Sequence, residues 1–161
     1  MPIRAKIACL CLTCLLSLAW GCVKTSMLYH GNKVTSATVV ALLEGGPTMG
    51  EWKTSDVTID YKYIKKGDEL EISGQAALSQ SNQMLYSNVS NMYSYIFFLD
   101  KDSRVIETEY FIEEWTDSTQ DNQKFSKSYK IPAGTTGLSF GYSGELKDLN
   151  STGTIYELPL K

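Results

Sequence analysis

An alternation of apolar and polar side chains with a period of two constrains this chain more than any other feature. It is clearest over residues 57–63, where Val, Ile and Tyr alternate with Thr, Asp and Lys. A polar turn follows at 65–68, and the alternation resumes over 70–76. A period of two is typical of half-buried strands, so these two segments predict a β-hairpin.

Further strands are predicted where similar runs lie between Gly, Pro, Asn and Asp, at 37–43, 93–99, 104–115, 125–131, 138–142 and 155–160. The segment 93–99 is apolar on both faces and predicts a central strand. Residues 79–91 and 116–123 are polar and are interpreted as loops. No window shows a helical period. The chain therefore predicts an all-β fold, an antiparallel sandwich of about seven or eight strands.

The N-terminus has the order of a secretory signal peptide. Arg4 and Lys6 give a positive start, residues 7–20 are almost entirely apolar, and small residues precede Cys22. The apolar run is shorter than the ~20 residues of a membrane-spanning helix. We therefore expect residues 1–21 to be removed as a signal peptide.

The residues before Cys22 resemble the lipobox of bacterial lipoproteins. Gly21 and Cys22 match it, Ala19 takes the position of its Leu, and Trp20 replaces its small residue. The resemblance implies a lipid on Cys22, and Val23 rather than Asp at the next position implies the outer membrane. An ordinary signal peptidase cut after Ala19-Trp20-Gly21 is the alternative, and it leaves the same mature terminus.

The positions of the four cysteines fit a lipid on Cys22. Besides Cys22 they are Cys9, Cys11 and Cys14, which all lie within the expected signal peptide. An exported mature chain would then have one thiol and no disulfide to form, and lipid attachment gives that thiol a use.

Length and charge narrow the class of protein. Removing the first 21 of 161 residues leaves 140, the length of one domain. Loss of Arg4 and Lys6 reduces the 15 basic residues to 13 against 18 acidic ones, a formal charge of −5. An acidic domain is not drawn to nucleic acid or anionic head groups. We expect a lipidated N-terminus and flexible tether at 22–36 and a β-sandwich domain at 37–161.

A second resemblance concerns the fold. The run Phe97-Phe98-Leu99-Asp100-Lys101-Asp102, followed by Val105-Ile106 and by Ile131-Pro132-Ala133-Gly134-Thr135, resembles small immunoglobulin-like domains of bacterial envelope lipoproteins. It covers about a third of the chain. It implies an immunoglobulin-like sandwich in the cell envelope and transfers no functional residue.

Residues that suggest catalysis have simpler interpretations. Residues 137–141 match Gly-x-Ser-x-Gly, but strand alternation continues through them, and the only histidine, His30, lies upstream. Asp100 and Asp102 lack the further ligands of a calcium loop and suit a β-turn. The glutamates at 107, 109 and 113 are interpreted as a solubilising strand face. We expect no enzyme, cofactor or metal site.

Aromatic side chains in or beside loops are the candidate contacts. They are Tyr29, Tyr86 and Trp115, because Tyr and Trp are enriched at recognition surfaces. The sequence thus predicts a lipid-anchored, non-catalytic envelope protein that contacts another envelope protein or peptidoglycan. The alternative is a small-molecule or lipid carrier with a cavity in a partly open β-barrel.

Overall fold

The computed structural model describes residues 27–35 and 38–159. The signal peptide and Cys22 lie outside the described residues. Within them the chain is all-β, with one short helix and strands in this order: β1 (Val40–Ala41), β2 (Gly45–Lys53), β3 (Val57–Lys66), β4 (Glu69–Leu78), α2 (Gln80–Leu85), β5 (Asn88–Leu99), β6 (Val105–Ile112), β7 (Gln123–Lys130), β8 (Gly137–Asp148) and β9 (Ser151–Glu157).

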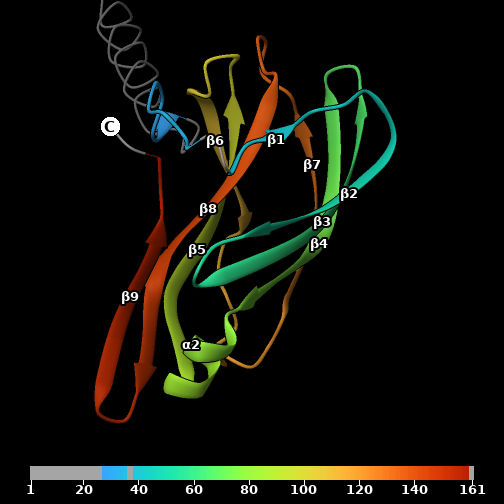
Figure 1. Ribbon diagram of the computed structural model, residues 1–161. Helices are drawn as coiled ribbons and strands as arrows, with labels where there is room; N and C mark the ends of the chain where they lie inside the picture. Colours follow the sequence, from blue (N-terminus) through green and yellow to red (C-terminus); the bar gives the residue numbers. More distant parts are fainter. Residues whose placement is uncertain (1–26, 36–37, 160–161) are drawn as a thin grey trace, which may run out of the picture.

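The strands form two antiparallel sheets that pack face to face (Figure 1). One sheet has the order β1-β8-β5-β6, and β9 pairs with the lower part of β8 on the same edge as β1. The other sheet has the order β2-β3-β4-β7. The predicted antiparallel all-β fold is confirmed. The two antiparallel sheets are separate and do not form a closed barrel.

The predicted hairpin is confirmed as β3 and β4, which pair along their whole length from Val57↔Leu78 to Lys66↔Glu69. Its turn contains Gly67, whose φ of 61° lies in the left-handed region that suits glycine. The inward residues of both strands are buried, because the alternation places every second side chain between the sheets.

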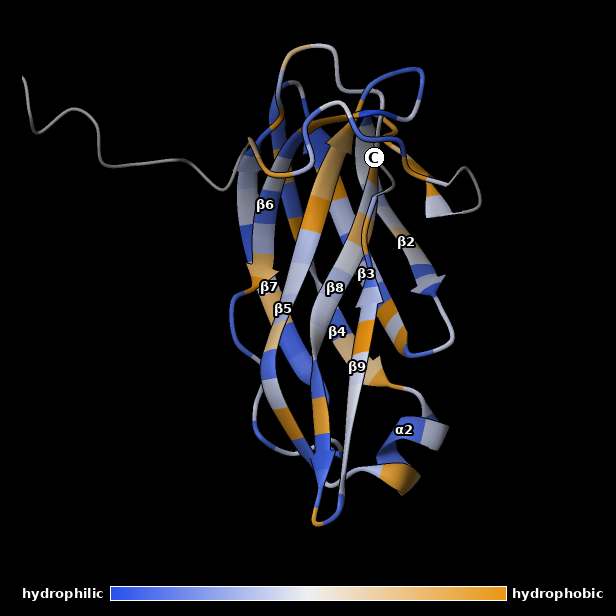
Figure 2. Ribbon diagram, turned by 90° about the vertical axis from the view of Figure 1, so that its left-hand side faces the viewer, coloured by the Kyte–Doolittle hydropathy of each residue, from blue (hydrophilic) through white to orange (hydrophobic). Residues whose placement is uncertain are grey.

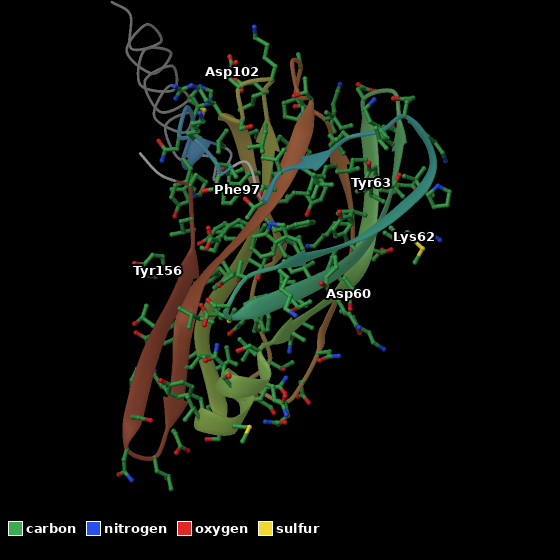
Figure 3. All side chains as sticks on the ribbon, in the orientation of Figure 1. Asp60, Lys62, Tyr63, Phe97, Asp102 and Tyr156 are labelled. Atoms are coloured by element: carbon green, nitrogen blue, oxygen red, sulfur yellow. The ribbon has the colours of Figure 1, made fainter. Side chains whose placement is uncertain are left out.

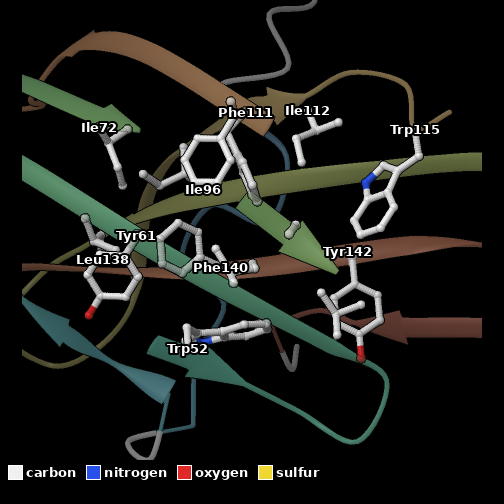
Figure 4. Packing of buried hydrophobic residues seen from close by; sticks show 14 of the residues in the cluster. Trp52, Tyr61, Ile72, Ile96, Phe111, Ile112, Trp115, Leu138, Phe140 and Tyr142 are labelled. Carbon is white, nitrogen blue, oxygen red and sulfur yellow. The ribbon is translucent and has the colours of Figure 1, made fainter. Parts of the chain in front are cut away.

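Aromatic rings fill the space between the sheets (Figure 4). Phe140 of β8 lies 5.4 Å from the ring of Tyr61 and 5.4 Å from that of Phe111, measured between centroids. Trp52 packs edge-on against Phe140 and Tyr142. Burial of these large rings is the main source of stability that joins the two sheets.

Two segments differ from the sequence prediction. Residues 45–53 form edge strand β2, although Gly45-Gly46-Pro47 indicated a turn and only Trp52 is buried in it. The predicted loop 79–91 contains helix α2 and the start of β5. Ser79 caps this helix by accepting a hydrogen bond from the amide of Asn82.

Residues 27–35 are docked on the sandwich, which corrects the predicted flexible tether for this part of the chain. The amide of Gly31 donates to the carbonyl of Val105 at 2.8 Å, and that of Val34 donates to the carbonyl of Ser103 at 2.9 Å. Val34 is buried with β5 residues. The segment has no apolar period, so its docking depends on a few side chains and on backbone hydrogen bonds.

Candidate functional site

The outer face of the sheet that contains β5 and β8 carries an unusual concentration of tyrosine. We call it the tyrosine face and define it by five residues from four parts of the chain, Tyr29, Tyr93, Tyr95, Tyr110 and Tyr156. Outer faces of antiparallel sheets are commonly polar. Here Tyr95, Phe97 and Leu99 alternate outward along β5 and form a second buried cluster.

Strand register sets the spacing of the two most exposed tyrosines. Ser143 of β8 pairs with Tyr93 on one side and with Tyr156 on the other. Tyr93 and Tyr156 therefore share one face, two strands apart, which is about 10 Å at the usual strand spacing. Their side chains are 39% and 65% exposed, and the small Ser143 lies between them.

The next row of the face is packed more tightly. Tyr95 pairs with Tyr110 of β6 on one side and with Gly141 of β8 on the other. The rings of Tyr95 and Tyr110 are 5.0 Å apart, and Tyr29 packs edge-on against Tyr95 and Phe97. The docked segment 27–35 thus covers one end of the tyrosine face and leaves the row of Tyr93 and Tyr156 uncovered.

The hydroxyl groups of Tyr29 and Tyr95 hold their protons at neutral pH. Burial, followed by the neighbouring hydroxyls of Tyr110 and Tyr29, raises the pKa of Tyr95 to about 12. Burial also raises the pKa of Tyr29. The Tyr95 hydroxyl is hydrogen-bonded to Tyr110 and Ser143. The face therefore offers a ligand apolar rings and neutral hydrogen-bonding groups.

The outer face of the opposite sheet has a different character. Asp60 and Lys62 project from β3 on that side, whereas Tyr156 projects from β9 on the other (Figure 3). Neighbouring outward residues of β4 and β7 include Glu71, Ser73 and Ser126. Charged and hydroxyl-bearing side chains are typical of a sheet face that is exposed to water. The two outer faces therefore differ, and the tyrosine face is the unusual one.

The structure separates the three contact candidates predicted from the sequence. Tyr29 is half-buried and belongs to the tyrosine face, with a positive φ of 64°. Trp115 is only 4% exposed and donates its indole N–H to the Ser94 hydroxyl at 2.8 Å in the core. Its assignment as a contact is therefore corrected. Its loop returns along β5, where the amide of Trp115 donates to the carbonyl of Met92.

Tyr86 lies at the opposite end of the sandwich, directly after α2. It lines an open hollow of about 230 Å³ with Met84 and Leu85 on one side and Gln120 and Asp148 on another. Its backbone carbonyl accepts a hydrogen bond from the Thr119 hydroxyl at 2.6 Å. Tyr86 and Tyr29 therefore belong to two distant surfaces.

The sequence did not single out Tyr110 and Tyr156, and it placed Tyr93 and Tyr95 in a predicted central strand. Their alternation along β5 was visible. Their assembly into one surface depends on the pairing of β6, β8 and β9 with β5, which a single sequence does not specify.

Ser139 and Asp100, which were considered for catalysis, form hydrogen bonds that stabilise the fold. Ser139 of the Gly-x-Ser-x-Gly match is buried near the start of β8 and donates to the carbonyl of Thr38 at 2.8 Å. Asp100 forms the predicted turn, where its carboxylate accepts from the amides of Asp102 and Arg104. Among residues 27–35 and 38–159, no three His, Cys, Asp or Glu side chains gather to hold a metal ion.

Comparison with protein-family models found no matching family, and comparisons with curated proteins and solved structures found no significant match. In the part of the chain that the structure describes, no helix is long and apolar enough to span a bilayer.

Proposed function

We propose that this protein is a non-catalytic binding module of the bacterial cell envelope, held on the outer membrane by a lipid on Cys22, and that the tyrosine face is its contact surface. The observation that carries the proposal is the asymmetry of the sandwich, with one outer face aromatic and the other charged. Tyrosine suits recognition because its ring is large, apolar and rigid while its hydroxyl forms hydrogen bonds.

The immunoglobulin-like class is part of this proposal. The chain changes sheet four times, between β1 and β2, between β4 and β5, between β6 and β7, and between β7 and β8. Such crossed connections are expected of Greek-key sandwiches, a class that includes many extracellular binding domains. The closely packed aromatic interior gives no support to the carrier alternative.

The partner is a protein or the cell-wall glycan, since tyrosine rings pack against both apolar side chains and the C–H faces of sugars. Tyr93 and Tyr156 stand on either side of Ser143, about 10 Å apart, which leaves room for one extended segment or one sugar ring between them. The acidic charge of the chain argues against a nucleic-acid partner.

The test uses the full chain in a bacterial host with the double variant Tyr93→Ser and Tyr156→Ser. Binding is measured by co-sedimentation with purified peptidoglycan and by in-cell cross-linking with mass spectrometry. We expect the variant to lose binding about tenfold or more, the loss typical of aromatic contact residues. Met49→Ser, on the charged outer face, is the matched control and should bind normally.

Equal binding by the double variant and the parent would reject the tyrosine face. Incorporation of an alkyne-labelled fatty acid into the parent, but not into Cys22→Ser, tests the lipid anchor separately. Thermal unfolding of each variant verifies that the fold is retained.

A further inference from the structure

The end of the sandwich farthest from residues 27–35 is a second candidate surface. In Figures 1 and 2, α2 and the β8–β9 turn lie at the lower end, and Figure 1 shows residues 27–35, in blue, at the upper end. We call this lower end the distal tip and define it as residues 80–87, 117–121 and 147–151. Its parts are joined by hydrogen bonds from Ser87 N to Lys147 O at 3.1 Å and from Gln120 Nε2 to Gln83 O at 2.8 Å.

Large apolar side chains stand exposed on this tip. Met84 is 79% exposed and Leu149 is 95% exposed, and Leu85 is exposed beside Met84. Single exposed apolar residues are ordinary, but three on one small tip beside a hollow lined by Tyr86 indicate an interaction site. Gly153 leaves room for the Tyr86 side chain, because a Cβ at position 153 would lie 2.5 Å from the Tyr86 hydroxyl.

The tip also carries unpaired negative charge. Asp117, Asp121 and Asp148 are exposed, and no lysine or arginine among the described residues forms an ion pair with them. The nearby Lys147 is engaged by Glu145 at 3.1 Å and by the Ser90 hydroxyl at 3.1 Å. The tip therefore combines protruding aliphatic groups with a net negative rim.

We propose that the distal tip docks a protein partner that inserts an apolar side chain into the Tyr86 hollow and presents Lys or Arg to the three aspartates. The charge of the rim is complementary to such a partner and disfavours a bilayer surface, whose head groups are anionic. The protruding groups are the aliphatic side chains of Met84, Leu85 and Leu149, whereas the aromatic Tyr86 in the hollow is half-buried and offers a sugar ring less of its plane. A protein is therefore preferred to a lipid or a glycan.

The place where the described chain begins fits this orientation. Under the proposed anchor, the five residue steps from Cys22 to Met27 span at most about 18 Å. The lipid then stays near the upper end and the distal tip points away from the membrane. This step depends on the proposed function, whereas the docking proposal itself depends only on the tip.

The experiment places the photo-reactive residue p-benzoylphenylalanine at Met84, at Leu149 or at Met49 in the full chain, expressed in a bacterial host. Met49 is the matched control because it is 76% exposed, close to the 79% of Met84, on the charged outer face. We expect positions 84 and 149 to give the same covalent protein adduct and position 49 to give none.

Two further variants test the chemistry of the contact. Leu85→Asp should lower the adduct yield about tenfold, and the combined change of Asp117, Asp121 and Asp148 to Asn should lower it and remove its sensitivity to salt. All four residues are exposed, so the fold should survive, and thermal unfolding verifies this. Tyr93→Ser with Tyr156→Ser should leave the adduct unchanged, which separates this proposal from the tyrosine face.

The proposal is overturned by the absence of an adduct, by equal adducts from position 49, or by adducts that Leu85→Asp leaves unchanged. An adduct with twice the mass of the chain would show that the tip binds a second copy of the protein. An adduct with lipid or glycan would show that it binds another class of ligand. Each of these results contradicts a basic protein partner.

Discussion

Tyrosine has two distinct uses in this molecule, and the position of its hydroxyl separates them. Inside the sandwich, Tyr63 donates to the carbonyl of Ala41 at 2.8 Å and accepts from the amide of Leu43 at 3.0 Å, which fixes β1 to the facing sheet. Tyr142 likewise reaches the hydroxyl of Thr54 at 2.8 Å. These rings fill the core while their hydroxyls join the sheets, whereas Tyr93 and Tyr156 present theirs to solvent.

A single glycine allows the tyrosine face to pack. At Gly141 an added Cβ would lie 2.5 Å from the ring of Phe97 and 2.5 Å from the carbonyl oxygen of Glu157. Gly46, in contrast, has nothing within 4 Å of an added Cβ. Gly141 is therefore required by the close Phe97 ring and the Glu157 carbonyl rather than by its own backbone conformation.

We predict that Gly141→Ala lowers the free energy of unfolding by about 1–3 kcal/mol, as overpacking does in close-packed interiors. Gly46→Ala should change it by less than about 0.5 kcal/mol, as is usual at open surface positions. Urea denaturation followed by circular dichroism measures both. Equal stability of the two variants would show that Phe97 does not pack against β8 in this way.

At the level of elements, the sequence predicted the interior strands better than the edge strands. The β3–β4 hairpin follows from alternation, since a period of two places each side chain, and the central strand β5 follows from a run that is apolar on both faces. Edge strand β2 escaped prediction because its glycines and proline are tolerated at an edge, where few side chains are buried. Helix α2 is too short to show a helical period.

Edge strand β6 shows how the acidic series is used. Glu107 pairs with Phe98 and Glu109 with Ile96, so both carboxylates lie on the inward side of an edge strand. Inward charges at an edge oppose pairing with a second sheet. Glu113 completes the series by pairing with Lys127 of β7, in the opposite sheet, at 3.4 Å. The sequence predicted a solubilising strand face for these glutamates, whereas the structure places Glu107 and Glu109 on the inward side of the edge strand.

Hydrogen exchange tests whether residues 27–35 are docked on the sandwich. Because the amides of Gly31 and Val34 donate to carbonyls of Val105 and Ser103, we predict that their hydrogen exchange is slowed roughly a hundredfold relative to an unstructured chain. Amide exchange followed by NMR measures this directly. Exchange at the unprotected rate at both positions would restore the free tether expected from the sequence.

At the scale of the whole molecule, the sandwich has an aromatic side, a charged side and two unlike ends. The sequence contained the residues of both candidate surfaces, yet only the fold brings them together. The tyrosine face depends on the pairing of four strands, and the distal tip depends on loops that meet after β4, β6 and β8. Such long-range pairing is the part of the structure that local patterns do not encode.

The number of buried tyrosines makes alkaline pH a test of the whole fold. Burial raises the pKa of Tyr29, Tyr61, Tyr95, Tyr129 and Tyr142 above the ordinary value, to about 12 for Tyr95. An unfolded chain loses these protons near pH 10. Above that pH the unfolded state binds fewer protons than the folded state, so stability falls as pH rises.

We therefore predict full stability below about pH 10 and a falling free energy of unfolding between about pH 10 and 12. Urea midpoints at two pH values, one on each side of pH 10, measure the loss. Tyr95→Phe should make the loss smaller, because it removes one group whose pKa differs between the two states. An unchanged midpoint across this range would mean that the tyrosine hydroxyls are open to water, and the packed aromatic faces of this fold would then be incorrect.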